Sequence, residues 1–359
     1  MYNILMRILI APLTISPSQD ANMMLCDNIA NLLKDEYHMP VICASEGNEF
    51  PSPVLHRPFS LFPPDSSDYD AWQNSIGAIR RPFLTRDISS VLSAIESFRP
   101  DLVISIDRMS AIIAATYSGI RCWAITCHAA YKKPFSEKNH VKTLNTVLDA
   151  YQIPPVTALS DLLHDAERRI VFGSPRMTPV PDGEGVDRIG VMSDFTNVLP
   201  ETNRVLVYLG DVKGLRTSLQ NMILDAFVGA PYEVYVSFDG CNEYTEDNVH
   251  VIEDPDYRLI PGSCVIIHDG NPYVSNISAA SGVMQMAVTN SDCPRMQVAV
   301  SLRKTKTGIY LFEEELNMSN LYESYRRLLS DDMYKENTQE LWLETVRLGD
   351  IKELLRLLD

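Results

Sequence analysis

The sequence lacks any uninterrupted apolar run close to the roughly 20 residues that a membrane-spanning helix requires. Its first apolar stretch, residues 1–12, is shorter and leads into a polar loop without the small-residue cleavage site of a signal peptide. We interpret this stretch as a buried strand rather than as a signal or an anchor. We therefore expect a cytoplasmic protein with no membrane span.

The sequence also lacks closely spaced cysteine pairs, since its seven cysteines include no C-x-x-C arrangement and lie mostly in apolar segments. We interpret them as reduced, buried thiols and expect neither disulfides nor a bound metal. Basic residues are in the minority, with 31 Lys and Arg against 47 Asp and Glu and a formal net charge of -16. Such a surface would repel a phosphate backbone, so nucleic-acid binding is not expected, although a helix N-terminus can hold a small anion locally.

What the sequence does contain is a repeated alternation of apolar, strand-like segments with helix-like segments. Its 359 residues are too many for one typical hydrophobic core, and the alternation is typical of parallel sheets with right-handed crossovers. A stretch rich in Pro and Gly, residues 176–203, is predicted to be the linker between two domains. We therefore expect an α/β protein with Rossmann-like domains at 1–190 and 191–335 facing a cleft. A C-terminal helix in 336–359 is expected to pack back toward the first domain.

Strands are expected where short apolar runs end in polar loops, and helices where apolar residues recur at helical spacing. The expected strands are 6–12, 40–45, 101–107, 122–128, 170–175, 204–210, 233–240, 249–254, 264–270, 284–290 and 308–312. The expected helices are 21–37, 88–98, 111–119, most of 137–166, 215–228, 272–281, 294–303 and two at the C-terminus. Residues 51–70, rich in Pro and Ser, are expected to form a long surface loop.

The most informative segment is the strand over 264–270 with the helix expected to follow it, because ligands of open parallel sheets bind beyond the carboxyl ends of strands. Asn271 is a good N-cap, and Pro272 suits the first helical turn. The backbone N–H groups of 273–275 are expected to be free and, with the helix dipole, to hold a diphosphate without a metal. Three neighbours complete this candidate site, a glycine that lets a phosphate approach and two side-chain donors: Gly270, Ser275 and Asn276.

His268, at the end of this strand, is open to two interpretations. A lone histidine at a strand end is more often a hydrogen-bonded structural residue than a ligand-binding one. The glycine that follows, the helix cap and the two-domain pattern favour a ligand-binding role. We adopt the ligand-binding role as the hypothesis.

The segment resembles the donor-binding motif of UDP-dependent and related glycosyltransferases, H-G-G-x-x-S-x-x-E-A-x-x-x-G-V-P. Residues 99–126 are similar to the strand-helix-strand segment of that family's first domain, and 205–214 to the strand that opens its second domain. The residues that match the motif are His268, Gly270, Ser275 or Asn276, and Gly282 with Val283. The further donor-site positions that the resemblance implies are Gly210, Asp211 and Asp292.

The resemblance implies a GT-B fold, with two Rossmann-like domains facing a cleft. It also implies a UDP- or dTDP-sugar as donor substrate, transfer with inversion, and no divalent metal ion. Several positions depart from the family pattern: Asp269 replaces its second Gly, Asp211 replaces a small hydroxyl residue, and Cys293 replaces the Gln after Asp292. The Glu-Ala of the motif has no clean counterpart, and Met284 replaces its final Pro. A carboxylate at Asp269 is compatible with a nearby diphosphate only where it points away or neutralises a basic neighbour.

The resemblance also suggests where an acid–base pair would lie. In inverting members a His after the first strand, held by an Asp after the fourth, deprotonates the acceptor hydroxyl. The corresponding loop here has no His, and its only titratable residue is Asp20, which equally suits the N-cap of the next helix. Asp107 matches the orienting Asp, or is simply a carboxylate at a helix N-terminus. His128, at the end of the strand over 122–128, is our candidate base, paired with Asp107 across adjacent strands.

Three functions follow from these observations. The leading hypothesis is hexosyl transfer from a nucleotide sugar to an unidentified acceptor. The second is a catalytically degenerate GT-B protein that binds a nucleotide sugar or regulates a partner glycosyltransferase, and the third is a sugar-nucleotide epimerase. The terminal helices could brace the first domain or form a homodimer contact. The acceptor is expected to contact the loops after the strands of the first domain. Segment 46–80 has no readable signature, and its aromatic residues suit an apolar or sugar-stacking acceptor and equally a packed loop: Phe50, Phe59, Phe62, Tyr69 and Trp72.

Overall fold

A computed structural model of the chain describes residues 6–14, 21–44, 68–133, 141–193, 203–210, 216–238, 241–289 and 292–358. These residues divide into two compact units. Unit 1 lies within 1–172, 178–189 and 351–359, and unit 2 lies within 173–177 and 190–350. The polypeptide therefore passes from one unit to the other four times.

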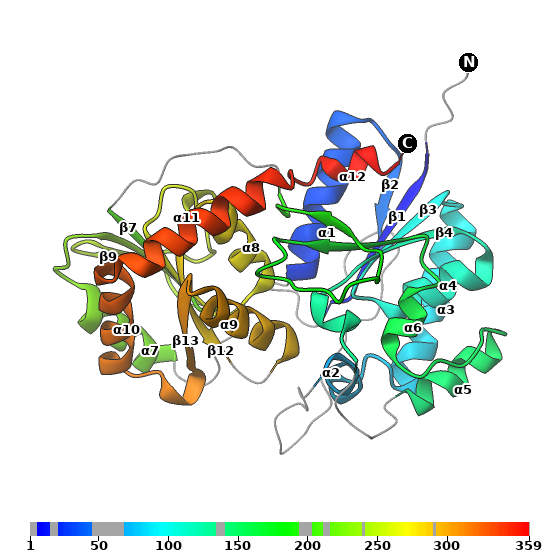
Figure 1. Cartoon of the computed structure of the whole chain (residues 1–359), viewed down its shortest axis with the longest axis horizontal. Helices are drawn as coiled ribbons and strands as arrows, with labels where there is room; N and C mark the ends of the chain where they lie inside the picture. Colours follow the sequence, from blue (N-terminus) through cyan, green and yellow to red (C-terminus); the bar gives the residue numbers. More distant parts are fainter. Residues whose placement is uncertain are drawn as a thin grey trace. The chain divides into compact units, whose positions relative to one another are not determined.

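Unit 1 contains a six-stranded sheet in the order β2-β1-β3-β4-β5-β6, and every pairing in it is parallel. Helix α1 packs on one face of this sheet, and helices α3 and α4 pack on the other (Figure 1). The strands are β1 (Ile8–Pro12), β2 (Val41–Cys43), β3 (Leu102–Ile106), β4 (Arg121–Ile125), β5 (Arg168–Phe172) and β6 (Asp187–Ile189). The α-helices are α1 (Ala21–Asn31), α2 (Tyr69–Ile76), α3 (Arg81–Phe98), α4 (Met109–Ser118), α5 (Lys142–Ala150), α6 (Leu159–Leu163) and α12 (Glu353–Arg356).

Unit 2 contains a seven-stranded sheet in the order β13-β12-β11-β7-β8-β10-β9, parallel throughout except for β9, which runs antiparallel to β10. Helices α7 and α10 lie together on one face, and α8, α9 and α11 lie on the other (Figure 1). The strands are β7 (Arg204–Tyr208), β8 (Glu233–Ser237), β9 (Tyr244–Glu246), β10 (Val249–Val251), β11 (Val265–His268), β12 (Met284–Thr289) and β13 (Gly308–Phe312). The helices are α7 (Arg216–Phe227), α8 (Pro272–Ala280), α9 (Cys293–Thr305), α10 (Met318–Ser330) and α11 (Asp332–Arg347).

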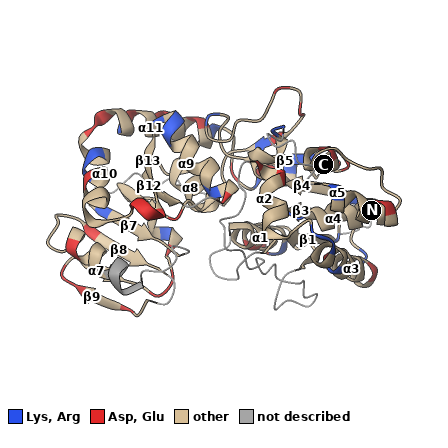
Figure 2. Ribbon diagram, turned by 90° about the horizontal axis from the view of Figure 1, so that it is seen from below, with Lys and Arg blue, Asp and Glu red and all other residues tan. Residues whose placement is uncertain are grey.

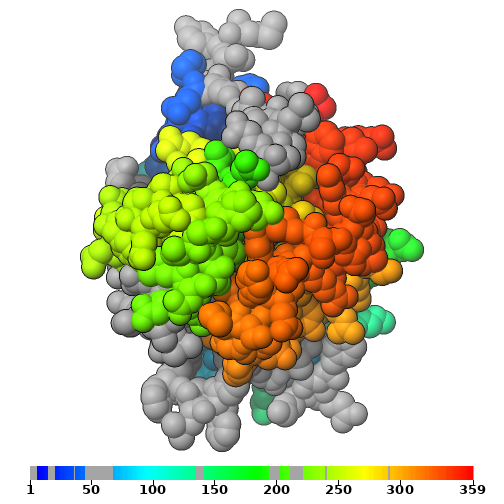
Figure 3. Space-filling view, turned by 90° about the vertical axis from the view of Figure 1, so that its left-hand side faces the viewer, coloured from blue at the N-terminus to red at the C-terminus, as the bar shows by residue number. Residues whose placement is uncertain are grey.

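The interior of both sheets explains why the strands could be located from the sequence. β1, β3 and β12 are buried along their whole length, because helices cover both faces of the sheet and select near-continuous apolar runs. The outer helices and loops of both units carry acidic and basic residues interleaved along the chain (Figure 2). In unit 2, α10 and α11 form one continuous stretch of surface (Figure 3).

Four expectations about the elements need correction. The predicted linker over 176–203 contains a strand, β6, which pairs with β5. The loop expected over 51–70 gives way at Tyr69 to a helix, α2, which has a side-chain cap from Asp68. The long helix expected over 21–37 ends at Asn31 and continues as a π-helical turn. The helices expected over most of 137–166 are present but shorter, since α5 covers Lys142–Ala150 and α6 covers Leu159–Leu163.

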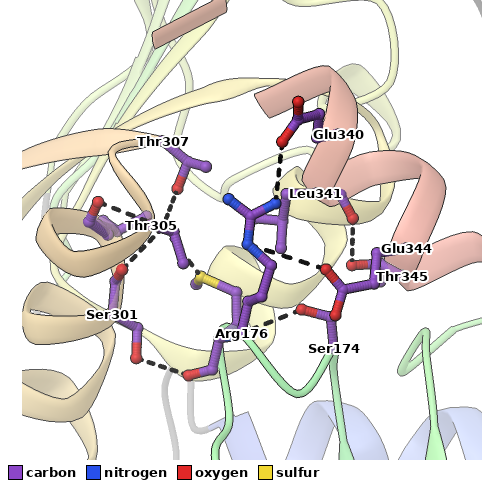
Figure 4. Close-up of polar contacts among 11 residues, drawn as sticks. Ser174, Arg176, Ser301, Thr305, Thr307, Glu340, Leu341, Glu344 and Thr345 are labelled. Atoms are coloured by element: carbon purple, nitrogen blue, oxygen red, sulfur yellow. Dashed lines mark hydrogen bonds and ion pairs between the residues drawn. The ribbon is translucent and has the colours of Figure 1, made fainter. Parts of the chain in front are cut away.

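Residues 173–177 form a short excursion from unit 1 into unit 2, between β5 and β6 (Figure 4). Met177 is buried there against α8, α9 and α11, in a cluster with Leu302 and Leu341. Its carbonyl accepts a 2.6 Å hydrogen bond from the Ser301 hydroxyl. Arg176, by contrast, reaches the surface and forms a 3.3 Å ion pair with Glu340 on α11. The buried methionine, more than the exposed arginine, therefore anchors the excursion.

Replacing Met177 by Ala is expected to reduce the free energy of unfolding by about 2–5 kcal/mol, since it leaves a cavity in this cluster. Arg176→Ala removes an exposed ion pair and is expected to change it by less than about 1 kcal/mol. Urea unfolding of the two variants beside the wild type measures the difference. Equal losses in the two variants would contradict the anchoring role of Met177.

Candidate functional site

The topology of unit 2 gives one preferred place for a ligand. β7 lies between β8 and β11, so the chain order reverses between β7 and β11, and ligands of open parallel sheets bind at such a switch point. His268 is paired with Tyr208 in the register of these two strands. Gly210 therefore lies just beyond the end of β7, and Asp269 lies just beyond the end of β11, on the two sides of the switch point. Asp211 lies outside the described residues.

His268 is fully buried, and both nitrogens of its ring are hydrogen-bonded inside unit 2. The backbone N–H of Gly270 donates to Nδ1 at 3.2 Å, so Nε2 carries the proton and donates to Oε1 of Gln285, also at 3.2 Å. Burial lowers the pKa of this imidazole from 6.5 to about 4. These contacts favour the structural interpretation of His268, and ligand binding by its ring remains a hypothesis.

The lowered pKa predicts a specific acid sensitivity. Between about pH 6.5 and pH 4 the folded protein binds fewer protons at His268 than the unfolded chain does. The contribution of this group to stability is therefore present above pH 6.5 and is lost as the pH falls toward 4, by up to about 3 kcal/mol. His268→Asn, which keeps an acceptor for the Gly270 amide, is expected to flatten this part of the unfolding free-energy profile. His164→Asn, at an exposed histidine, serves as the control, and a profile in His268→Asn as steep as in the control would contradict the prediction.

Asp269 is buried and already neutralised. Its Oδ2 lies 3.1 Å from Nη1 of Arg295 on α9, and the same nitrogen donates to the Asp269 carbonyl at 3.0 Å. Its Oδ1 accepts from the backbone N–H of Asn271 at 3.1 Å. From the sequence, Asp269 was required to point away from a diphosphate or to neutralise a basic neighbour. The ion pair with Arg295 meets the second of these conditions.

Gly270 has a different reason to be glycine from the one expected. Its φ of 81° lies in the left-handed region, and an added Cβ would lie 3.1 Å from Cβ of Arg295 and 3.3 Å from the Thr289 hydroxyl. The space in front of its Cα is therefore filled by unit 2 itself. The expected role, to admit a phosphate, is not what this packing requires.

The start of α8 agrees with the predicted cap but not with the predicted free amides. Asn271 is the N-cap and Pro272 begins the helix, as expected. The Asn271 side-chain oxygen, however, accepts from the N–H groups of Tyr273 at 2.9 Å and Val274 at 3.3 Å. The N–H of Ser275 donates to the Asn271 carbonyl. The backbone amides of 273–275 were predicted to be free, but all three are hydrogen-bonded, because the residue that caps the helix accepts from them.

The two predicted side-chain donors on α8 also differ from expectation. Asn276 donates from Nδ2 to the Gly190 carbonyl at 2.8 Å and accepts from the Met192 N–H at 2.9 Å. Both polar ends of its amide thus hold the segment that leads from β6 into unit 2. Ser275 is buried, and among the described residues its hydroxyl has no hydrogen-bond partner. The Ser275 hydroxyl therefore keeps a donor that a ligand could use.

Asp292 occupies the N-cap position of α9 and is buried. It lies after β12, the neighbour of β11, and therefore at the same edge of the sheet as Asp269. The structure accordingly brings His268, Asp269, Asn271 and Asp292 to one edge of unit 2. Gly210 follows β7 at that edge as well.

In unit 1 the corresponding switch point lies between β1 and β3, and Asp107 follows β3 there. Asp107 has a φ of 53°, a left-handed conformation that Asp tolerates better than most residues. Its Oδ1 accepts from the Tyr69 hydroxyl at 2.8 Å and from the Cys127 N–H at 3.2 Å. The strand predicted over 122–128 ends at Ile125, so His128 lies beyond β4, where it begins a 3-10 helix (His128–Tyr131); β4 itself pairs with β3. Asp20, the alternative candidate, lies outside the described residues.

The strained turn at Asp107 is held by its neighbour, Arg108, which is almost completely buried. The guanidinium forms a bidentate pair with Asp87 on α3, with contacts of 3.0 Å and 2.5 Å. It also donates to the Ala44 carbonyl at 2.8 Å, and the Ser110 hydroxyl donates to Asp87. These bonds fix the start of α4 and hence the backbone position of Asp107.

Sequence reasoning missed four polar residues of these two sites. Asp87, Arg108 and Gln73 on α2 lie in unit 1, and Arg295 lies in unit 2. Each is polar and buried or mostly buried, which is uncommon for these residue types without a partner. Arg108 directly after a candidate Asp was the available signal. Within the described residues no helix is long and apolar enough to span a membrane. Across these same ranges no cluster of three or more His, Cys, Asp or Glu side chains is placed to hold a metal.

Comparison with known proteins places this geometry in a known fold. No protein-family model and no curated protein sequence matches the chain. Solved structures match over its whole length. The spinosyn rhamnosyltransferase SpnG superposes with a TM-score of 0.73 at 15% identity, over 98% of this chain and 99% of SpnG. The chain has the GT-B fold.

Two further GT-B structures support the same conclusion. The glycosyltransferase VinC in complex with dTDP gives a TM-score of 0.70 at 16% identity, over 98% of each chain. SsfS6, a glycosyltransferase of Streptomyces sp. SF2575, gives 0.69 at 18% identity, over 98% of this chain and 99% of SsfS6. The α/β fold class and the GT-B resemblance proposed from the sequence are thereby confirmed at the level of the fold.

Proposed function

We propose that this protein is a cytoplasmic glycosyltransferase that moves a sugar from a dTDP- or UDP-sugar to a hydroxyl of an unidentified acceptor, with inversion and without a metal ion. The observation that carries the proposal is the match to glycosyltransferases over 98% of the chain, with VinC and one SpnG structure containing thymidine diphosphate. Unit 2 would bind the donor at the β7–β11 switch point. Unit 1 would bind the acceptor at the β1–β3 switch point.

In this proposal the chemistry divides between the two sheet edges. His128 would remove the proton of the acceptor hydroxyl, with Asp107 stabilising the imidazolium that forms. The acceptor oxygen would attack the anomeric carbon as the bond to the nucleoside diphosphate breaks. The diphosphate would leave carrying the electron pair, and donors at the start of α8 would stabilise its charge.

The capped start of α8 sets a condition for this donor site. The Asn271 side chain must rotate away before phosphate oxygens can accept from the amides of Tyr273 and Val274. The exchange replaces a neutral acceptor by a charged one, and charge-assisted hydrogen bonds are the stronger kind. In this proposal the diphosphate displaces the Asn271 side chain from these two amides as it binds.

Asn271→Gly is expected to tighten binding of thymidine diphosphate by about tenfold, because glycine keeps most of the capping preference without competing for the amides. The matched control is Asn317→Gly, since Asn317 caps α10 through the Asn320 N–H in the same way. This control is expected to leave the affinity unchanged. Isothermal titration calorimetry with both variants measures the effect. Unchanged or weaker binding in Asn271→Gly would show that these amides do not hold the diphosphate.

A degenerate GT-B protein that binds a nucleotide sugar without turnover is the second candidate. The occupied amides of α8 and the internally bonded His268 are the observations in its favour. A donor-hydrolysis and transfer assay over a panel of dTDP- and UDP-sugars separates the two. Turnover supports the transferase, whereas saturable binding without turnover supports the degenerate protein. Absence of both would remove both proposals.

A further inference from the structure

The carboxylate of Asp107 is held from two elements at once. One hydrogen bond comes from the Cys127 N–H after β4, and the other comes from the Tyr69 hydroxyl on α2. The first is a consequence of strand pairing, because Cys127 lies just beyond β4, which ends at Ile125 and pairs with β3. The second is not, since α2 is separated from both strands in the sequence. Helix α2 therefore adds a side chain to this site that the sheet alone does not explain.

The direction of the hydrogen bonds at Tyr69 is fixed by Gln73, one turn later on α2. The Gln73 Nε2 group donates to the Tyr69 oxygen at 2.9 Å. A phenol has one proton to give, so the Tyr69 proton is committed to Oδ1 of Asp107 at 2.8 Å. The chain from Gln73 through Tyr69 to Asp107 thus runs in one direction, and hydrogen bonds in such a chain strengthen one another.

The helix that presents these side chains is itself fixed in place. Asp68 caps it through the Ala71 N–H at 2.8 Å. Asp70 accepts at 3.0 Å from the N–H of Leu159, the first residue of α6. The Tyr69 and Trp72 rings pack with their centroids 5.6 Å apart. Tyr69 and Gln73 are both buried, so the hydroxyl has little freedom to leave Asp107.

We propose that Tyr69 is a positioning residue that keeps Asp107 ionised and oriented, with Gln73 fixing the direction of its hydroxyl. The role of Asp107 in transfer rests on the proposed function, whereas the hold of Tyr69 on the carboxylate does not. Two donors on one oxygen favour the charged form of a carboxyl group. In this proposal the oriented carboxylate of Asp107 accepts a hydrogen bond from the base, for which His128 is the candidate. The same burial that keeps Tyr69 in place, followed by the nearby Asp107 charge, raises the Tyr69 pKa well above its usual value, so its hydroxyl stays a donor.

The test compares Tyr69→Phe and Gln73→Leu with Tyr131→Phe in the full-length protein. Tyr131 is a matched control because its buried hydroxyl bonds Thr126 Oγ1 at 3.0 Å, at the same sheet edge. In the transfer assay Tyr69→Phe is expected to lower kcat by about 100-fold with the donor KM within about twofold, since orientation and not donor binding is lost. Gln73→Leu is expected to lower kcat less, and Tyr131→Phe is expected to leave it within about twofold of wild type. Circular dichroism and thermal unfolding confirm that the variants are folded.

A second measurement does not depend on turnover. The carboxyl carbon of Asp107, assigned by its loss in Asp107→Asn, is titrated by 13C NMR in protein labelled at aspartate. The titration midpoint is expected to be higher in Tyr69→Phe than in wild type and unchanged in Tyr131→Phe, because only the first removes a donor to the charged form. Cys127 and His128, which are titratable and lie at this edge, are the same in all these proteins. Tyr131 also lies near Asp107, but burial raises its pKa to about 12, so it stays uncharged while a carboxyl group titrates.

The outcomes separate the inference from the proposed function. If the wild type turns over and Tyr69→Phe matches it in kcat, the inference is overturned and the proposed function stands. If the wild type turns over no donor, the proposed function fails, and the NMR midpoint alone decides on Tyr69. An unchanged midpoint in Tyr69→Phe overturns the inference in either case.

Discussion

Asp87→Ala is expected to destabilise the protein by about 3–5 kcal/mol, because it leaves the buried Arg108 guanidinium without its counter-charge. The bonds from Arg108 to the Ala44 carbonyl and to Ser110 go to neutral groups and cannot replace a bidentate carboxylate. Chemical unfolding of the purified variant measures the loss. Asp187→Ala serves as the control, since it removes a partly exposed partner of Arg168 and is expected to cost less than about 1 kcal/mol.

The same variant tests how the turn at Asp107 is held. Arg108 follows Asp107 directly, so a change in its anchoring moves the carboxylate that Tyr69 and Cys127 bind. Replacing both charged partners by apolar residues, Asp87→Leu with Arg108→Met, is expected to recover much of the lost stability. A loss in Asp87→Ala no larger than in Asp187→Ala would mean that the buried pair does not stabilise the fold.

His128→Ala is expected to lower kcat for sugar transfer by about 10²–10⁴-fold, because that is the range in which a general base contributes. Binding of thymidine diphosphate is expected to be unchanged, since the donor site of the proposed mechanism lies in unit 2. Initial rates with the active donor, together with calorimetric titration of the diphosphate, measure the two quantities.

The matched control for this variant is His164→Ala, which removes an exposed histidine 3.4 Å from Glu184. It is expected to leave both kcat and diphosphate affinity within about twofold of wild type, as surface substitutions usually change little. Unchanged turnover in His128→Ala would eliminate His128 as the base. The base would then have to come from elsewhere in unit 1, with Asp20 the other residue indicated by the sequence.

Most strands of both sheets could be predicted from the sequence to within a few residues. Buried parallel strands are short, nearly continuous apolar runs, and polar residues mark their ends because the chain there reaches the sheet edge. This is why Asp107 and His268 were correctly identified at strand ends, whereas β4 ends at Ile125 and His128 begins the short 3-10 helix that follows. What the sequence could not supply was the strand order, and with it the switch points at which those ends meet.

Helix α2 shows a different limit. It buries Tyr69, Asp70 and Gln73 along with Trp72, so its inward face is partly polar and gives no clean apolar periodicity. The Pro- and Ser-rich residues before it also predict a loop. Its role depends on contacts with Asp107 and Leu159, which are distant in the sequence, and no local pattern encodes them.

The start of α8 shows a third limit, in which a correct local prediction led to a wrong conclusion. Asn271 was recognised as an N-cap, and the structure confirms it. A good cap is a side chain that occupies the first amides, so the same signal argues against their being free. The sequence likewise indicated that Asp269 would need a basic neighbour if it faced a diphosphate, but it did not identify Arg295 on the next helix as that neighbour.

The excursion at 173–177 has a consequence for dissecting this protein into fragments. A contiguous piece covering 190–350 would contain every strand of its own sheet but would lack Met177, leaving an apolar hole among α8, α9 and α11. A piece ending at 172 would in turn lack β6 and the segment around α12. A fragment cut at a single point in the sequence therefore lacks part of the unit that it should contain. To produce either unit alone, the missing stretches would have to be added as separate peptides or joined to the fragment in a permuted order.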